Sequence, residues 1–180
     1  EGQNIYRIWY DKPASYWEEA LPVGNGRIAA MVFGDPQLEQ IQLNEETVSA
    51  GSPYQNYNEE AKTALPEMRR LIFEGKYEEA QNMAATKILS QVGNEMPYQT
   101  VGRLNIRYQD HKKVNNYYRD LDISNAVAVT RYEVDGVEFT EETFASFTDQ
   151  LVIRHIKASK PGTINCELFF NTPMRDPKRS

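Results

Sequence analysis

A β-hairpin is encoded by the stretch Tyr132-Glu133-Val134-Asp135-Gly136-Val137-Glu138-Phe139. Apolar and charged side chains alternate on both sides of the central Asp-Gly pair, which is the period of a β-strand. An Asp-Gly pair accepts the positive φ angles of a type I′ turn, and the twist of that turn matches two antiparallel strands. The stretch therefore predicts an antiparallel hairpin and makes antiparallel β-structure the expected fold class.

Similar segments lie on both sides of this hairpin. Alternating positions Ile164, Cys166, Leu168 and Phe170 predict a half-buried strand. Residues 27–33 and 37–43 flank the turn Gly34-Asp35-Pro36 and predict a second hairpin, in which Leu38, Ile41 and Leu43 are the apolar positions. Further strands are predicted at residues 5–10, 103–108, 117–121 and 151–156. About eight or nine short strands without strand-helix alternation favour an antiparallel β-sandwich.

The apolar period changes to three or four between residues 58 and 89, as in a helix. The positions concerned are Leu65, Met68, Ile72, Tyr77, Ala80, Ala84 and Ile88. Asn58 is a suitable N-cap, Gly75 is a suitable end for the first helix, and Pro66 implies that this helix starts late or is kinked. The sequence thus predicts a helical hairpin at about residues 58–90, inserted between strands.

Length and charge restrict the class of protein. A chain of 180 residues predicts a single domain over residues 1–180. The net charge is −6 without a long basic run, which argues against nucleic acid as a partner. The longest apolar runs, such as residues 28–33, are far shorter than the roughly 20 residues of a membrane span. Residues 1–4 lack the features of a signal peptide, which agrees with a trimmed exported protein and with a cytoplasmic one.

No residue pattern predicts an active site. Adjacent acidic pairs such as Glu18-Glu19 point in different directions, whereas Asp120 and Asp122 share one face of a strand at about 6–7 Å. For that pair, turn and capping roles are the favoured interpretation over a catalytic dyad. The only two histidines, His111 and His155, have no metal-ligand spacing, so no metal site is predicted. Cys166, the single cysteine, excludes an intrachain disulfide and is expected to be an inert, buried thiol.

Two other patterns leave alternatives open. Gly24-Asn25-Gly26 is followed by a strand rather than a helix, so a tight turn is preferred over a phosphate-binding loop. A set of tyrosines is either packed in the core or able to stack on sugar rings, as in a carbohydrate-binding module. These are Tyr54, Tyr57, Tyr98, Tyr108, Tyr117 and Tyr118.

Two blocks of sequence resemble the opening of glycoside hydrolase family 95. The first block is residues 17–34 with Leu21-Pro22-Val23-Gly24-Asn25-Gly26-Arg27, and the second is residues 40–47 with Gln42-Leu43-Asn44-Glu45-Glu46-Thr47. The likeness continues through the helical stretch 61–80, residues 98–104 and 118–123, Tyr132, and Phe144-Ala145-Ser146. It covers nearly the whole chain.

This resemblance implies an N-terminal β-sandwich of the super-sandwich type, which in that family precedes a helical linker, an (α/α)₆ catalytic barrel and a C-terminal β domain. The usual activity is inverting hydrolysis of terminal α-1,2-linked L-fucose, with some members acting on L-galactose. The catalytic residues of the family belong to the barrel. The chain is therefore expected to be a truncated, non-catalytic N-terminal domain without catalytic residues, metal or cofactor.

The resemblance also implies partners. The expected partner is the protein's own catalytic domain, oligosaccharide is bound only through the parent enzyme, and the location is extracytoplasmic. Two loops, at residues 24–27 and 44–53, are the predicted docking sites, with candidates Gly24, Asn25, Gly26, Arg27, Asn44, Glu45, Thr47 and Ser49. Alternatives are a stand-alone carbohydrate-binding module and a structural interaction module.

Two positions depart from the family pattern. Ser49-Ala50-Gly51 stands where the family usually has Trp-Ser-Gly, and Glu141 stands where it usually has Arg. If that tryptophan packs against the catalytic domain in other members, docking or substrate is expected to differ in this protein.

Overall fold

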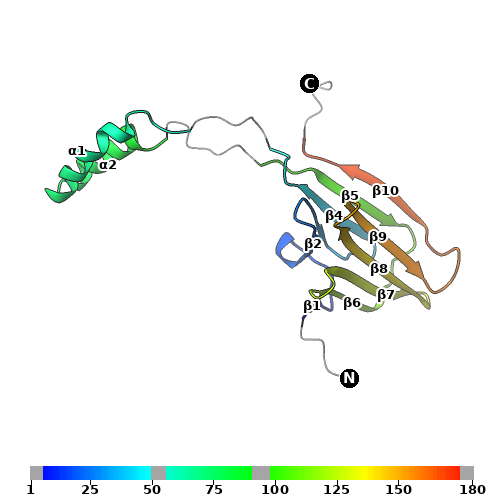
Figure 1. Ribbon diagram of the computed structural model, residues 1–180. Helices are drawn as coiled ribbons and strands as arrows, with labels where there is room; N and C mark the ends of the chain where they lie inside the picture. Colours follow the sequence, from blue (N-terminus) through cyan, green and yellow to red (C-terminus); the bar gives the residue numbers. More distant parts are fainter. Residues whose placement is uncertain (1–5, 50–55, 91–97, 175–180) are drawn as a thin grey trace. The chain divides into compact units, whose positions relative to one another are not determined.

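A computed structural model describes residues 6–49, 56–90 and 98–174 (Figure 1). The chain falls into two compact units, one formed by residues 1–48 and 100–180 and the other by residues 49–99. Each unit is described by itself, and a single domain over residues 1–180 stays a prediction.

The first unit consists of two antiparallel five-stranded sheets, which confirms the predicted mainly-β sandwich (Figure 1). Sheet A has the order β1 (Arg7–Tyr10), β6 (Asn115–Asp122), β7 (Val127–Val134), β8 (Val137–Ser146), β9 (Leu151–Ala158). Sheet B has the order β10 (Cys166–Asn171), β5 (Gly102–Tyr108), β4 (Leu38–Glu45), β3 (Ile28–Val32), β2 (Leu21–Gly24). A short 3₁₀ turn, η1 (Trp17–Glu19), lies between β1 and β2.

Both predicted hairpins are present. In the β7–β8 hairpin Val134 pairs with Val137, and the turn residues Asp135 and Gly136 have φ angles of 49° and 74°. Positive φ at both positions is what a type I′ turn requires. In the β3–β4 hairpin Val32 pairs with Ile41.

The core lies between the sheets. Strand β2 contacts β6, β7 and β8 of the opposite sheet, and β3 contacts β8 and β9. The main cluster of buried side chains comprises Leu21, Val23, Ala30, Val32, Ile41, Ile106, Tyr108, Leu121 and Ala128. A smaller cluster of Tyr132, Val134, Val137 and Phe139 sits under the β7–β8 hairpin.

Strand β10 corrects one expectation. Cys166 is partly buried against the main cluster, but Leu168 and Phe170 are 63% and 52% exposed. Both side chains point to the inner face of sheet B, because Leu168 pairs with the buried Ile106. They are uncovered because sheet A ends at β9 within the described residues, and β9 packs mainly on β3 and, through Arg154, on β4.

The second unit confirms the predicted helical insertion between β4 and β5. It contains α1 (Ala61–Phe73), α2 (Tyr77–Met83) and a π-helical turn, η2 (Ala84–Ile88). Ala64, Leu71 and Ala80 are the buried apolar residues of these helices. None of the helices in the described ranges is long and apolar enough to cross a bilayer.

The ends of α1 differ in detail from the prediction. Gly75 follows the helix with a φ of 76°, as expected for its stop. Glu60, rather than Asn58, occupies the N-cap position, and the Asn58 side chain instead accepts a hydrogen bond from the Glu60 backbone N–H at 3.0 Å. Pro66 lies inside the helix, so a late start is wrong.

Candidate functional site

The side chain of Asn25 connects two turns at one end of the sandwich. Its Oδ1 accepts hydrogen bonds from the backbone N–H groups of Arg27 and Ile28, at 3.0 and 2.9 Å, which closes the β2–β3 turn. Its Nδ2 donates to the carbonyl of Ser146, at 2.8 Å, in the region of the β8–β9 turn. One asparagine thus ties a turn of sheet B to a turn of sheet A.

Glu45 connects the same turn to the end of β4. Its Oε1 accepts from Arg27 Nε at 3.0 Å, while its Oε2 accepts from the Thr47 backbone N–H at 2.9 Å and from the Thr47 hydroxyl. The hydrogen bonds from Thr47 and Arg27 lower the pKa of the Glu45 carboxyl below its usual value. The result is an ordered polar rim, in which Glu45 is the anionic side chain and Arg27 the cationic one.

The structure therefore brings together most of the predicted docking residues. Those that lie at this rim are Gly24, Asn25, Gly26, Arg27, Asn44, Glu45 and Thr47. Ser49 belongs to the second unit, where it forms a β-bridge with Tyr98, and residues 50–53 of the predicted loop lie outside the described residues. Docking through the rim stays a prediction.

An apolar cavity of about 300 Å³ opens beside the rim. Ile28, Leu43 and Leu104 of sheet B face Leu151 and Val152 of β9 across it, and Arg154 also borders it. Its mainly aliphatic lining suits an apolar side chain better than a sugar, because sugar sites need several placed polar groups.

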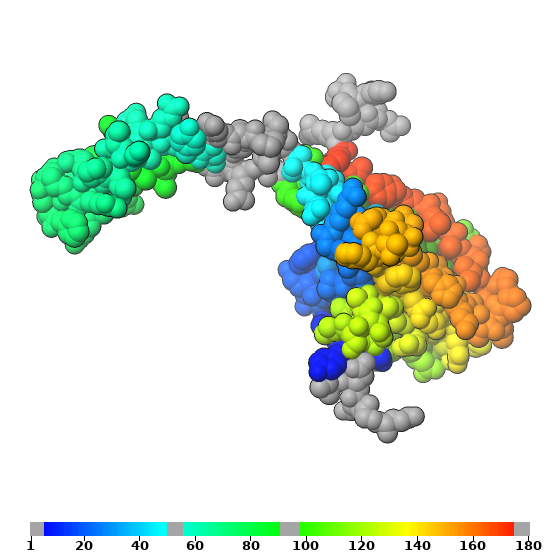
Figure 2. Space-filling view, viewed as in Figure 1, coloured from blue at the N-terminus to red at the C-terminus, as the bar shows by residue number. Residues whose placement is uncertain are grey.

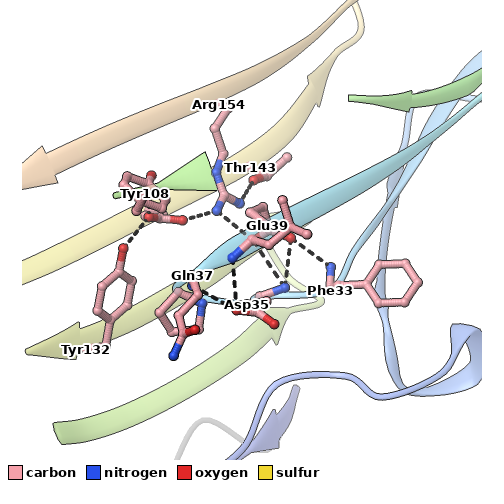
Figure 3. A network of polar contacts seen from close by, with 12 residues as sticks. Phe33, Asp35, Gln37, Glu39, Tyr108, Tyr132, Thr143 and Arg154 are labelled. Atoms are coloured by element: carbon pink, nitrogen blue, oxygen red, sulfur yellow. Dashed lines mark hydrogen bonds and ion pairs between the residues drawn. The ribbon is translucent and has the colours of Figure 1, made fainter. Parts of the chain in front are cut away.

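Behind this cavity, three strands share a buried ionic cluster (Figure 3). Arg154 on β9 donates through Nη2 to Glu39 Oε2 on β4, at 2.8 Å, and to Glu141 Oε2 on β8. Its Nη1 donates to the Thr143 hydroxyl at 2.6 Å. Because Glu39 belongs to sheet B and the other three residues to sheet A, the guanidinium joins the two sheets.

The remaining carboxylate oxygens of the cluster are also hydrogen-bonded. Glu39 Oε1 accepts from the backbone N–H groups of Phe33 and Gly34, at 3.1 and 2.9 Å (Figure 3). Glu141 Oε1 accepts from the hydroxyls of Tyr108 and Tyr132, each at 2.6 Å. Arg154 Nε has no hydrogen-bond partner within the described part of the chain. Glu141, one of the two departures from the family pattern, is thus fully engaged inside the fold.

Burial dominates the ionisation of Glu39 in this cluster. It raises the pKa of Glu39 to about 7, against the attraction of Arg154, and the nearby Glu141 adds to the increase. Burial and the charge of Glu141 also raise the pKa values of Tyr108 and Tyr132. Glu39 and Glu141 are 0% and 1% exposed, so a substrate cannot reach them and they are not a hydrolytic carboxylate pair.

Asp120 and Asp122 are not a catalytic dyad either. Arg7 lies between them, with Nη1 at 2.9 Å from Asp120 Oδ2 and Nη2 at 3.5 Å from Asp122 Oδ2. Asp122 also accepts from the Ser124 N–H at 2.9 Å and from Asn125 Nδ2 at 3.2 Å. The preferred interpretation, a turn and capping role, is confirmed for Asp122, whereas Asp120 is an ion-paired residue with 1% exposure.

The histidines and the cysteine are apart from one another. His111 is buried, stacks on Tyr108 at 4.4 Å between ring centroids, and has Nδ1 at 3.0 Å from the Pro36 carbonyl oxygen. Burial lowers the pKa of His111. His155 is exposed and contacts Glu142. Within residues 6–49, 56–90 and 98–174, no three His, Cys, Asp or Glu side chains cluster in a way that could hold a metal ion.

The tyrosines proposed for sugar stacking do not share a face. Tyr108 is buried, and Tyr117 donates its hydroxyl to the Gly34 carbonyl at 2.6 Å. Tyr57 and Tyr98 are exposed in the second unit, and Tyr54 lies outside the described residues. On the sandwich, only Tyr118 of this set, itself half-buried, stacks with an exposed aromatic residue: Trp9 is 60% exposed, and the ring centroids are 6.2 Å apart.

Sequence reasoning missed the buried charges, although a signal was present. Glu39 is two residues before Ile41, and Arg154 is two residues after Val152, so each charge lies on the apolar face of its strand. A charge on the apolar face of a strand must be paired inside the fold. The same holds for Arg119, which is 0% exposed and donates to the carbonyls of Lys12 and Glu19, at 2.8 and 2.7 Å.

These features define a β-sandwich domain with a buried ionic cluster between its sheets and an ordered polar rim at one end. The sequence profile described as glycosyl hydrolase family 65, N-terminal domain, matches residues 8–180, and the chain belongs to this family. The match confirms an N-terminal domain of a glycoside hydrolase. The family in the description of the profile is 65, whereas the resemblance predicted family 95.

Curated relatives agree with this assignment. The chain is 37% identical over 180 residues to "Alpha-L-fucosidase 2" of Arabidopsis thaliana, covering 97% of this chain and 21% of the relative. It is 26% identical to "Probable alpha-fucosidase A" of Aspergillus niger, covering 84% of this chain and 20% of the relative. The chain therefore spans about a fifth of the length of the relatives that it matches.

Proposed function

We propose that this chain is the non-catalytic N-terminal domain of an inverting α-L-fucosidase of glycoside hydrolase family 95 that acts on α-1,2-linked L-fucose. The observation that carries the proposal is the 37% identity to an α-L-fucosidase over 97% of this chain but only 21% of the relative. In the longer protein, a barrel carboxylic acid protonates the glycosidic oxygen while a water activated by a second group attacks from the opposite face. An α-L-galactoside is the alternative substrate.

Hydrolysis assays test this division of labour. The 180-residue chain and the longer protein are incubated with an α-1,2-fucosylated oligosaccharide, and released fucose is measured with its anomeric form by NMR. We expect no turnover by the short chain and release of β-L-fucose by the longer protein. Activity in the short chain, or retention of configuration, contradicts the proposal. Preferential release of L-galactose from the matched galactoside supports the alternative substrate.

The polar rim is the proposed docking surface for the catalytic domain. The support is that Arg27 is 58% exposed at its side chain yet is fixed in place by Glu45, so it presents an ordered cation to a partner. Arg27→Ala in the longer protein is expected to lower the melting temperature and the activity, with little effect on the short chain. Arg107→Ala is the matched control, because the Arg107 side chain is 52% exposed and forms an ion pair with Glu167 elsewhere on sheet B. Equal effects of both variants would refute docking through the rim.

A stand-alone carbohydrate-binding module is the second candidate function. The exposed ring of Trp9, which stacks on the half-buried Tyr118, favours it, since aromatic faces bind sugar rings. NMR titration of the short chain with fucosylated oligosaccharides tests it. Millimolar or tighter binding that is lost in Trp9→Ala and Tyr118→Ala supports this function, whereas no shift changes at these residues reject it.

An extracytoplasmic location is part of the proposal and rests on the resemblance to family 95. Fractionation of cells that express the longer protein from its natural gene, with immunodetection, tests it. Recovery in the cytoplasmic fraction would contradict it.

A further inference from the structure

The inner face of sheet B carries apolar side chains that nothing in the described residues covers. Leu168 and Phe170 on β10 are 63% and 52% exposed although they point to the same side as the buried core residue Ile106. In Figure 2 the orange-red atoms of β10 lie at the surface of the sandwich. Inward-facing residues of a sandwich are normally covered by the opposite sheet.

The opposite sheet stops short of these residues. Strand β9 is the edge of sheet A among the described strands and pairs only with β8. It contacts β3, which is three strands away from β10 in sheet B. The Arg154–Glu39 ion pair brings β9 over β4 as well, so at a spacing of about 4.8 Å per strand β10 lies about 10 Å beyond the part of sheet B that β9 covers.

The apolar cavity occupies the first part of this uncovered area. It lies between β9 and the strands β4 and β5, with Leu43 and Leu104 on one side and Val152 on the other. Phe170 continues the same apolar surface outward, because its ring lies over Gly102 of β5. An apolar surface therefore runs from the cavity beside β9 outward to Phe170 and Leu168 on β10.

An unpaired strand edge beside an uncovered apolar surface fits one kind of occupant. The backbone groups of β9 that do not bond to β8 need partners, and the uncovered apolar surface needs apolar side chains on one face of the occupant. A β-strand with alternating apolar residues supplies both. Two added strands, about 10 Å wide, reach from β9 to the level of β10.

We propose that two extended segments of the remaining polypeptide of the longer protein add to the edge of β9 and cover Leu168, Phe170 and the cavity. The polypeptide itself is the proposed source because the chain covers only 21% and 20% of the relatives that it matches, so most of their length lies outside it. The proposal shares with the proposed function only the premise that the protein is longer.

Hydrogen exchange followed by mass spectrometry tests the added strands. The 180-residue chain and the longer protein are compared in peptides that cover β9 and β10, with the central strand β7 as internal control. We expect exchange in β9 to be at least tenfold slower in the longer protein, and β7 to exchange equally in both. Equal rates in β9 overturn the proposal. Protection of β9 in the short chain that grows with protein concentration also overturns it, because a second copy is then the occupant.

Variants test the apolar face. Leu168→Asn and Phe170→Asn are expected to lower the melting temperature of the longer protein by roughly 4 °C or more, and that of the short chain by less than about 1 °C. Ile123→Asn is the matched control, because Ile123 is 55% exposed and directly follows β6, which is three strands away from β9 in sheet A. It is expected to have a small effect in both proteins, and equal effects of all three variants refute the proposal.

These readouts are independent of enzyme activity. A longer protein that protects β9 but releases no fucose refutes the proposed function and supports the added strands. A longer protein that releases fucose but leaves β9 unprotected refutes only the proposal of added strands.

Discussion

Replacing Glu39 by glutamine is expected to change how stability depends on pH. In the folded chain, burial raises the pKa of Glu39 from 4.5 to about 7. In the unfolded chain the carboxyl titrates near its ordinary value. Between these two pH values the folded state therefore binds more protons than the unfolded state, so the free energy of unfolding falls as pH rises.

The magnitude follows from the shift. A difference of one pKa unit is about 1.4 kcal/mol. Ionisation of Glu39 alone therefore lowers the free energy of unfolding by about 3 kcal/mol as the pH rises from 4.5 to above 7. His111 acts in the opposite direction, because burial lowers its pKa and the unfolded state gains the proton first as pH falls. The contribution of Glu39 is thus isolated only by comparison with a variant.

Glu39→Gln cannot ionise, so the variant is expected to lose this pH dependence. Relative to the protonated Glu39 carboxyl, the amide has a pH-independent cost of about 1–3 kcal/mol, since it places a donor against the Arg154 guanidinium or against the N–H groups of Phe33 and Gly34. The difference in free energy of unfolding between wild type and variant should therefore shrink by about 3 kcal/mol from pH 5 to pH 8.

Urea unfolding at several pH values measures this difference, with near-ultraviolet circular dichroism to report on the buried tyrosines. Glu167→Gln removes the same charge at an exposed position and serves as control. Parallel curves for wild type and Glu39→Gln across this pH range would refute the assignment of a raised pKa to Glu39.

Three further variants test local contacts through the free energy of unfolding in urea. Gly102→Ala is expected to cost about 3 kcal/mol, because a Cβ there meets the Asn171 carbonyl oxygen at 2.6 Å and φ is 137°. Gly26→Ala is the control and is expected to cost about 1 kcal/mol, because φ is 92° but the space around it is open. Equal losses in the two variants would contradict the clash at Gly102. Asn25→Ala removes two acceptor contacts and a donor, and a loss of about 1–2 kcal/mol is expected; no loss would show that the turns hold without it. Tyr132→Phe removes one hydroxyl from Glu141 and should cost about 2 kcal/mol, and a neutral result would contradict that hydrogen bond.

The strands could be predicted because their information is local. The Asp135-Gly136 turn and the alternation around it determine the β7–β8 hairpin without reference to distant residues. The helical insertion could be predicted in the same way, because its apolar residues recur every three or four positions. The exposure of Leu168 could not be predicted from its period, because alternation shows that two faces differ but not whether a second sheet reaches the apolar one.

The candidate site was predicted in part. The turn residues Asn25 and Arg27 were selected from a resemblance, and the structure places them beside Glu45 in one polar rim. The partners of Glu39 could not be inferred, since Arg154 lies on the opposite sheet and is brought to it only by sheet packing. The sequence does show that Glu39 and Arg154 each lie on the apolar face of their own strand.

The order of strands has a consequence for how the chain folds. Strands β6 to β9 follow one another as neighbours, so sheet A can form largely from successive local hairpins. In sheet B, Leu43 pairs with Gly102 although the whole helical insertion lies between them, and β10 joins β5 only after all of sheet A has been synthesised. Pairings between distant segments form late because closing long loops costs entropy. Pulse-labelling hydrogen exchange during refolding should therefore show β7 and β8 protected before β4 and β5.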